Sequence, residues 1–136
     1  MQFPKNEPVT DRPLVVLLPA AMEQSPRTDV ADALRRLGYA VGRTVDLTAL
    51  EAGGSYLEGT GSLVLDRAAR IGFACLSART SQVAVRIFCE RLGYEPVTFD
   101  AEDRDGHSIY HTNVMMSVGS GFAVVCSEAI RNLHDR

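Results

Sequence analysis

The sequence predicts an α+β protein built from repeated units of hairpin, helix and strand. Apolar runs with strand character alternate with two segments whose apolar residues recur at helical spacing. The first of these segments ends in Arg36-Leu-Gly-Tyr39 and the second in Arg91-Leu-Gly-Tyr94, with the two glycines 55 residues apart. A repeat of this length is typical of propellers and solenoids. The alternative is coincidence, because Arg-Leu-Gly-Tyr is a common helix ending.

The first predicted unit spans residues 13–56 and follows a proline-containing arm, residues 1–12. We expect a buried strand, then a helix that begins with Thr28 as N-cap and ends at Gly38. A second strand and a turn complete the unit. The ranges of the two strands and the turn are 14–18, 41–47 and 52–55.

The second predicted unit spans residues 57–108. Its hairpin is joined through the segment 67–70, and its helix begins at Thr80-Ser81 and ends at Gly93. A further strand and a polar turn follow the helix. The three strands and the turn occupy residues 61–66, 71–76, 96–99 and 103–106.

The start of a third unit is predicted over residues 109–136. Two apolar strands, residues 114–118 and 122–126, form a hairpin around Gly119-Ser-Gly121. Ser127 is the predicted N-cap of a last helix. The chain length of 136 residues fits a single domain.

Composition narrows the possible partners. The net charge of -3 argues against nucleic acid. The sequence shows neither an apolar run of membrane-spanning length nor a signal-peptide pattern, so we expect a cytoplasmic protein without a membrane partner. Cys75, Cys89 and Cys126 lie in apolar contexts without metal-ligand spacing, and neither a metal nor a cofactor is expected.

Glu58 and His111 are the candidate catalytic residues. Glu58 directly precedes Gly-Thr-Gly, where a planar ligand can approach the backbone closely, and a carboxylate there can act as a base. His111 lies at the predicted start of a strand and can act as a general acid or base. The structural alternatives are a solvated loop glutamate and a hydrogen-bonded strand histidine.

Three further residues are predicted to bind substrate. Asn113 lies two positions after His111, so on a strand the two side chains would share a face. Gly59 and Thr60 belong to the loop that follows Glu58. The three cysteines are predicted to be structural, with Cys126 the strongest exception because it lies at a strand–helix junction.

Three long motifs occur in order along the chain. They are Leu57-Glu-Gly-Thr-Gly-Ser-Leu-Val-Leu-Asp-Arg67, Ala74-Cys-Leu-Ser-Ala-Arg-Thr80 and Ile109-Tyr-His-Thr-Asn-Val-Met-Met116. Together they resemble the arginine deiminase/amidinotransferase superfamily, and most closely its citrulline-utilisation hydrolase branch. The resemblance covers residues 14–130.

The resemblance implies a pentein-like α/β propeller with five ββαβ blades, of which this chain would form about two and the start of a third. Family members attack a guanidino or ureido carbon with a cysteine, while a histidine and an acidic residue handle protons. Glu58 matches the acidic residue and His111 the histidine. Asn113 stands where arginine deiminases carry Asp, and its neutral amide suits a ureido group such as that of citrulline.

Departures from the family pattern lead to two functional hypotheses. The family's nucleophilic cysteine belongs to a later segment, and Phe3-Pro-Lys-Asn6 only partly matches an upstream motif. We therefore expect a central fragment of a hydrolase or amidinotransferase that acts on arginine, citrulline or a similar compound. The alternative is an inactive ligand-binding or assembly module. Open blade edges predict homo-oligomers.

Overall fold

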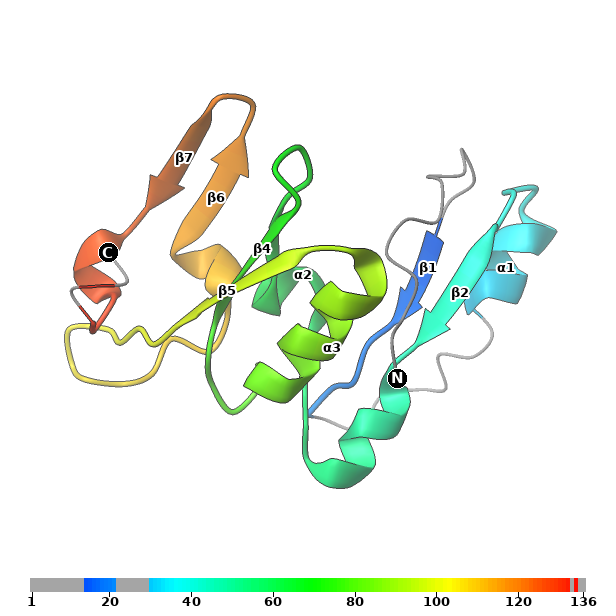
Figure 1. The fold of residues 1–136 in the computed structure, drawn as a ribbon. Coiled ribbons are helices and arrows are strands. Elements are labelled where there is room, and N and C mark those ends of the chain that lie inside the picture. The colour runs from blue at the N-terminus through cyan, green and yellow to red at the C-terminus, as the bar shows by residue number, and fades with distance from the viewer. Residues whose placement is uncertain (1–13, 22–29, 133, 135–136) are drawn as a thin grey trace.

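Three small sheets form the framework of the protein, as a computed structural model shows (Figure 1). The structure describes residues 14–21, 30–132 and 134. The sheets follow one another across the molecule in chain order. The predicted α+β class is confirmed, whereas the number of propeller blades stays a prediction. The predicted arm, residues 1–12, and the predicted N-cap Thr28 lie outside the described residues.

The first sheet contains two parallel strands, β1 (Leu14–Leu17) and β2 (Arg43–Asp46). Parallel neighbours need a crossover, and helix α1 (Val30–Arg36) lies within it. The turn predicted at 52–55 forms the end of a longer element that begins at Thr48, the 3-10 helix η1 (Thr48–Gly53), with Gly54 as its C-cap. The Asp46 carboxylate explains this earlier start, because it accepts hydrogen bonds from the backbone N–H and the hydroxyl of Thr48 at 2.9 and 2.7 Å.

The central sheet shows the predicted hairpin, helix and strand. Strand β3 (Val64–Asp66) pairs antiparallel with β4 (Ile71–Cys75), and β5 (Glu95–Phe99) lies parallel on the other side of β4. Helix α3 (Gln82–Leu92) connects β4 to β5. The two predicted helix boundaries are confirmed: the Ser81 side chain accepts from Ala84 N–H, and Gly93 adopts a left-handed conformation with φ 71°.

The predicted strand at 61–66 is wrong at its first two residues, which belong to a short helix, α2 (Gly59–Ser62). The Ser62 hydroxyl causes this turn, because it accepts a hydrogen bond from Glu58 N–H at 2.9 Å and draws residues 58 and 62 together. Gly59 enters the turn with φ 59°, a conformation that favours glycine. The apolar run Leu63-Val-Leu65 continues the chain into β3 only after this turn.

The third sheet is the predicted hairpin, formed by β6 (Met116–Gly119) and β7 (Phe122–Val125). It starts two residues later than expected, because Thr112–Val114 form a 3-10 helix, η2. The predicted last helix is also wrong in type: Ser127–Ala129 form a 3-10 helix, η3, and Cys126 rather than Ser127 occupies the N-cap position.

Two main clusters of buried side chains hold the sheets together. One joins α3 and the central sheet to β2, with Val45, Leu57, Val85 and Phe88 among its members. The other lies between the central sheet and the β6–β7 hairpin. The described helices are all too short or too polar to cross a membrane.

Candidate active site

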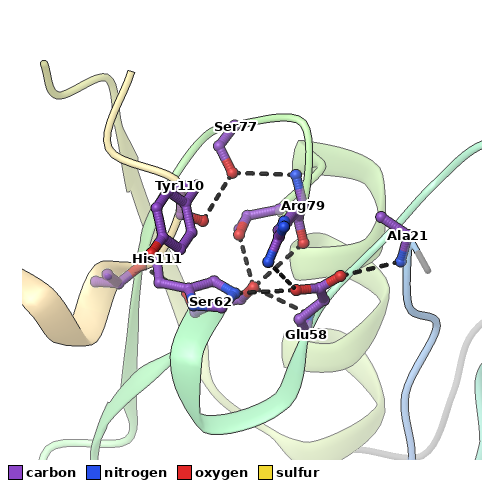
Figure 2. Close-up of polar contacts among 9 residues, drawn as sticks. Ala21, Glu58, Ser62, Ser77, Arg79, Tyr110 and His111 are labelled. Atoms are coloured by element: carbon purple, nitrogen blue, oxygen red, sulfur yellow. Dashed lines mark hydrogen bonds and ion pairs between the residues drawn. The ribbon is translucent and has the colours of Figure 1, made fainter. Parts of the chain in front are cut away.

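Three chain segments bring their polar side chains together beside the central sheet (Figure 2). Glu58 lies immediately before α2, Arg79 lies in the loop between β4 and α3, and His111 lies immediately before η2. Glu58 and His111 thus border short helical turns, and Arg79 lies in a connecting loop. Loops anchored in this way commonly carry functional groups.

The two predicted catalytic residues are in direct contact. His111 Nε2 lies 3.0 Å from Glu58 Oε2, across a sequence separation of 53 residues. An ionised carboxylate only accepts hydrogen bonds, so with Glu58 ionised this contact corresponds to the His111 tautomer that carries its proton on Nε2. The other carboxylate oxygen of Glu58 accepts from Ala21 N–H at 3.1 Å. Both side chains are largely buried, with 22% of His111 and 12% of Glu58 exposed.

Arg79 and Tyr110 complete the polar group and were not singled out from the sequence. Arg79 Nη1 lies 3.6 Å from Glu58 Oε2, and its guanidinium carbon lies 5.1 Å from the centre of the Tyr110 ring. The Tyr110 ring meets the His111 ring edge-on at 4.8 Å. Both residues lie within the motifs that carry the family resemblance, and this position in the motifs was the signal that could have identified them from the sequence. The Arg79 side chain remains 40% exposed.

Below this group, three buried hydroxyl residues fix the backbone of all three segments. They are Ser62, Thr80 and Thr112, with relative exposures of 0%, 1% and 0%. The Thr80 hydroxyl donates to Ser62 Oγ at 2.7 Å, and the Thr112 hydroxyl donates to the Ser62 carbonyl at 2.6 Å. The Thr112 oxygen also accepts from Cys75 N–H at 2.8 Å. The network thereby connects α2, η2 and β4.

Ser77 forms a second connection at the outer side of the site. Its hydroxyl donates to the Tyr110 carbonyl at 2.9 Å and accepts from Arg79 N–H at 3.1 Å. The backbones that carry Arg79 and His111 are thus joined through Ser77, whose two hydrogen bonds Figure 2 shows, in addition to the buried hydroxyl network.

The predicted substrate-binding residues have different positions. Gly59 is the first residue of α2, beside Glu58, and Thr60 is exposed on the same helix. Asn113 is exposed within η2. The strand on which the predicted shared face with His111 depended is wrong here, because Thr112–Val114 form η2 and β6 begins only at Met116.

Among the described residues, none of the three cysteines makes a hydrogen bond to Glu58 or His111. Cys75 and Cys89 have no exposed surface, whereas Cys126 is exposed. Burial raises the pKa of the Cys75 thiol, which donates to the Ile109 carbonyl at 3.3 Å. Burial also raises the pKa of Cys89 to about 11. Both buried thiols are therefore poor nucleophiles.

A group of potential metal ligands occurs on the polar turn at 103–106 and just after it. Ligand atoms of Asp103, Asp105 and His107 lie within 4.8 Å of one another, and all three residues are exposed. Asp103 Oδ1 already accepts hydrogen bonds from the N–H groups of Asp105 and His107, each at 2.9 Å. These bonds account for the turn as a local backbone motif.

The fold and the site define an α+β protein with a partly buried carboxylate–imidazole pair, an arrangement suited to general acid–base chemistry. The family model described as N,N dimethylarginine dimethylhydrolase, eukaryotic, matches residues 3–136. The chain belongs to this family, and thereby to the arginine deiminase/amidinotransferase superfamily that the motifs predicted. The citrulline-utilisation branch stays a prediction. Neither the curated proteins nor the solved structures contain a match.

Proposed function

We propose that this chain contributes the proton-handling part of a site that hydrolyses a C–N bond of a guanidino compound. The Glu58–His111 contact at 3.0 Å carries this proposal, because it couples a carboxylate to an imidazole in a mostly buried position. The description of the family model favours N,N-dimethylarginine as the first candidate substrate. Arginine and citrulline remain the alternatives that the sequence motifs favour.

The contacts of the site suggest a role for each group. The Glu58 carboxylate can attract a guanidinium cation and accept hydrogen bonds from its N–H groups. His111 Nδ1 has no hydrogen-bond partner among the described residues, so it can exchange a proton with a bound molecule. The exposed part of the Arg79 guanidinium can pair with the carboxylate of an amino-acid substrate.

The proposed reaction needs a thiolate that attacks the guanidino carbon. When the C–N bond breaks, its electrons go to the departing amine, which takes a proton from the imidazolium of His111. Water then cleaves the carbon–sulfur bond, and the thiol is recovered. We propose that neither Cys75 nor Cys89 supplies the thiolate, because both are fully buried and have raised pKa values.

A second candidate function is ligand binding or assembly without catalysis. The burial of Cys75 and Cys89, and the lack of a hydrogen bond from any described cysteine to Glu58 or His111, favour this function for the 136-residue chain acting alone. On this hypothesis, the chain binds guanidino compounds through Glu58 and Arg79 but releases no product. We expect no turnover of dimethylarginine, arginine or citrulline by the chain alone.

Calorimetric binding and product release test these proposals together. We expect dimethylarginine to bind, and Glu58→Gln to weaken binding about ten- to a hundredfold, because a charge-assisted hydrogen bond contributes roughly 1.5–3 kcal/mol. Glu90→Gln removes an exposed carboxylate on α3 and is the matched control. Equal affinity for all three proteins would refute the proposed role of Glu58. Robust amine or ammonia release that Cys126→Ser abolishes would instead identify Cys126 as the nucleophile.

A further inference from the structure

We propose that Gly61 is a positioning residue for His111. Because Gly61 has no side chain, the imidazole ring can lie directly against α2, and in that position it contacts Glu58. The functional meaning of this inference rests on the proposed role of His111. The structural claim depends only on the packing of the His111 ring against α2, and it can be tested without measuring enzymatic activity.

The contact between Gly61 and the ring is too close for any other residue. A Cβ added to Gly61 would lie 2.8 Å from His111 Nδ1, 2.9 Å from Cε1 and 2.9 Å from Cγ. Cβ atoms in proteins essentially never come this close to other heavy atoms, so the ring or the helix would have to shift. Their near equality also shows that the added atom would lie over the face of the ring, since an atom in the ring plane beyond Nδ1 would be much farther from Cγ and Cε1.

The backbone itself does not require glycine at this position. Gly61 lies inside α2 and, unlike Gly59 with φ 59°, does not have a left-handed conformation. Alanine is the residue that helices favour most, and it normally stabilises a helix relative to glycine. The imidazole is therefore the group that alanine at position 61 would displace.

The neighbours of His111 determine what this displacement does. The Tyr110 ring lies at 4.8 Å, and Nε2 meets Glu58 Oε2 at 3.0 Å. Glu58 is in turn held by Ala21 N–H and approached by Arg79. We expect a ring pushed away from Gly61 to lengthen its contact with Glu58.

The tautomer of His111 tests this inference in the full chain. Long-range ¹H–¹⁵N spectra recorded well above the usual titration range of imidazole report which nitrogen carries the proton. We expect His111 to carry it on Nε2 in the natural sequence, and Gly61→Ala to give a mixture of tautomers. Gly53→Ala is the matched control, because an added Cβ there meets nothing within 4 Å and the backbone is not left-handed. His107 is exposed and provides an internal reference.

If Gly61→Ala alone fails to fold, a double-mutant cycle of Gly61→Ala and His111→Ala, followed by thermal denaturation, still tests the inference. We expect Gly61→Ala to lower the melting temperature in the natural sequence and to raise it or leave it unchanged in His111→Ala, where the ring is absent. Unchanged His111 spectra in Gly61→Ala, or equal destabilisation in both backgrounds, would overturn the inference. Neither outcome depends on ligand binding. The proposed function is therefore tested separately, by the binding and product-release experiments.

Discussion

At the scale of single residues, the central feature is that polar side chains distant in sequence meet at one point. Glu58 and His111 share a contact, and Arg79 approaches the same carboxylate oxygen. The sequence identified Glu58 and His111 as candidates because each lies in a long family motif. It did not reveal Arg79 or Tyr110 as members of the group, because their roles depend on loops that meet only in three dimensions.

Thr112 provides a residue-scale prediction about stability. Its hydroxyl donates to the Ser62 carbonyl and accepts from Cys75 N–H, so Thr112→Val leaves two buried backbone groups without these partners. We expect the free energy of unfolding to fall by about 2–4 kcal/mol. Urea denaturation measures the change. Thr44→Val, at an exposed position on β2, is the control, and an equal effect of both variants would contradict the importance of the network.

The cysteines give a prediction about reactivity. A thiol reagent attacks the thiolate, and burial together with a raised pKa suppresses it at Cys75 and Cys89. We expect one label, on Cys126, in the native protein at neutral pH and three after denaturation. Peptide mass spectrometry identifies the sites. Rapid labelling of Cys75 or Cys89 in the native state would contradict the described packing.

Cys89 also predicts a pH dependence of stability. Its pKa rises from the ordinary value of 9.0 to about 11 on folding, so the unfolded chain loses this proton first as the pH increases. The contribution to stability is complete below pH 9.0 and is lost as the pH rises towards about 11. Its size is about 2–3 kcal/mol. We expect Cys89→Ala to show a smaller loss of stability over this interval in denaturant titrations, and parallel curves would refute the assignment.

At the scale of elements, the sequence was most informative where local signals agreed. Helix α3 has a serine N-cap, an apolar stripe and a left-handed Gly93 at its end, and both of its boundaries were predicted. The pairing of β3 with β4 was also predicted, since both segments are apolar and a short connection joins them. Such local agreement makes an element recognisable without its neighbours.

The elements that form the site were harder to predict, for a physical reason. Helix α2 exists because the Ser62 hydroxyl accepts from Glu58 N–H and is itself held by Thr80 from another loop. The 3-10 helix η2 likewise contains Thr112, whose hydroxyl is bound to Ser62 and Cys75. Except for the local bond between Glu58 and Ser62, these contacts are tertiary, and the local apolar pattern alone indicated strands at both places.

At the scale of the whole molecule, the hairpin β6–β7 leaves apolar surface uncovered. Phe122, Val124 and Val125 on β7 are 63%, 61% and 44% exposed. In the central sheet, by contrast, β4 has a strand on each side, and two of its apolar residues, Ala74 and Cys75, are fully buried. Strand edges and apolar faces of this kind favour association. We propose that β7 mediates self-association.

A charged substitution on β7 tests this proposal. We expect Val124→Lys to shift the chain towards monomer, because a buried ammonium group opposes packing at the strand edge. Light scattering over a range of concentrations measures the mass. Val83→Lys introduces the same charge at an exposed position on α3 and serves as the control. A natural chain that stays monomeric at high concentration would contradict the proposal.

The most direct test of the account is a titration of dimethylarginine followed at the ring signals of His111. If Glu58 and His111 form one ligand site, the His111 signals shift in proportion to occupancy, while those of exposed His107 do not. Glu58→Gln then weakens the response about ten- to a hundredfold. His111 signals that stay unchanged at saturating ligand, or a response that survives Glu58→Gln undiminished, would contradict the central claim.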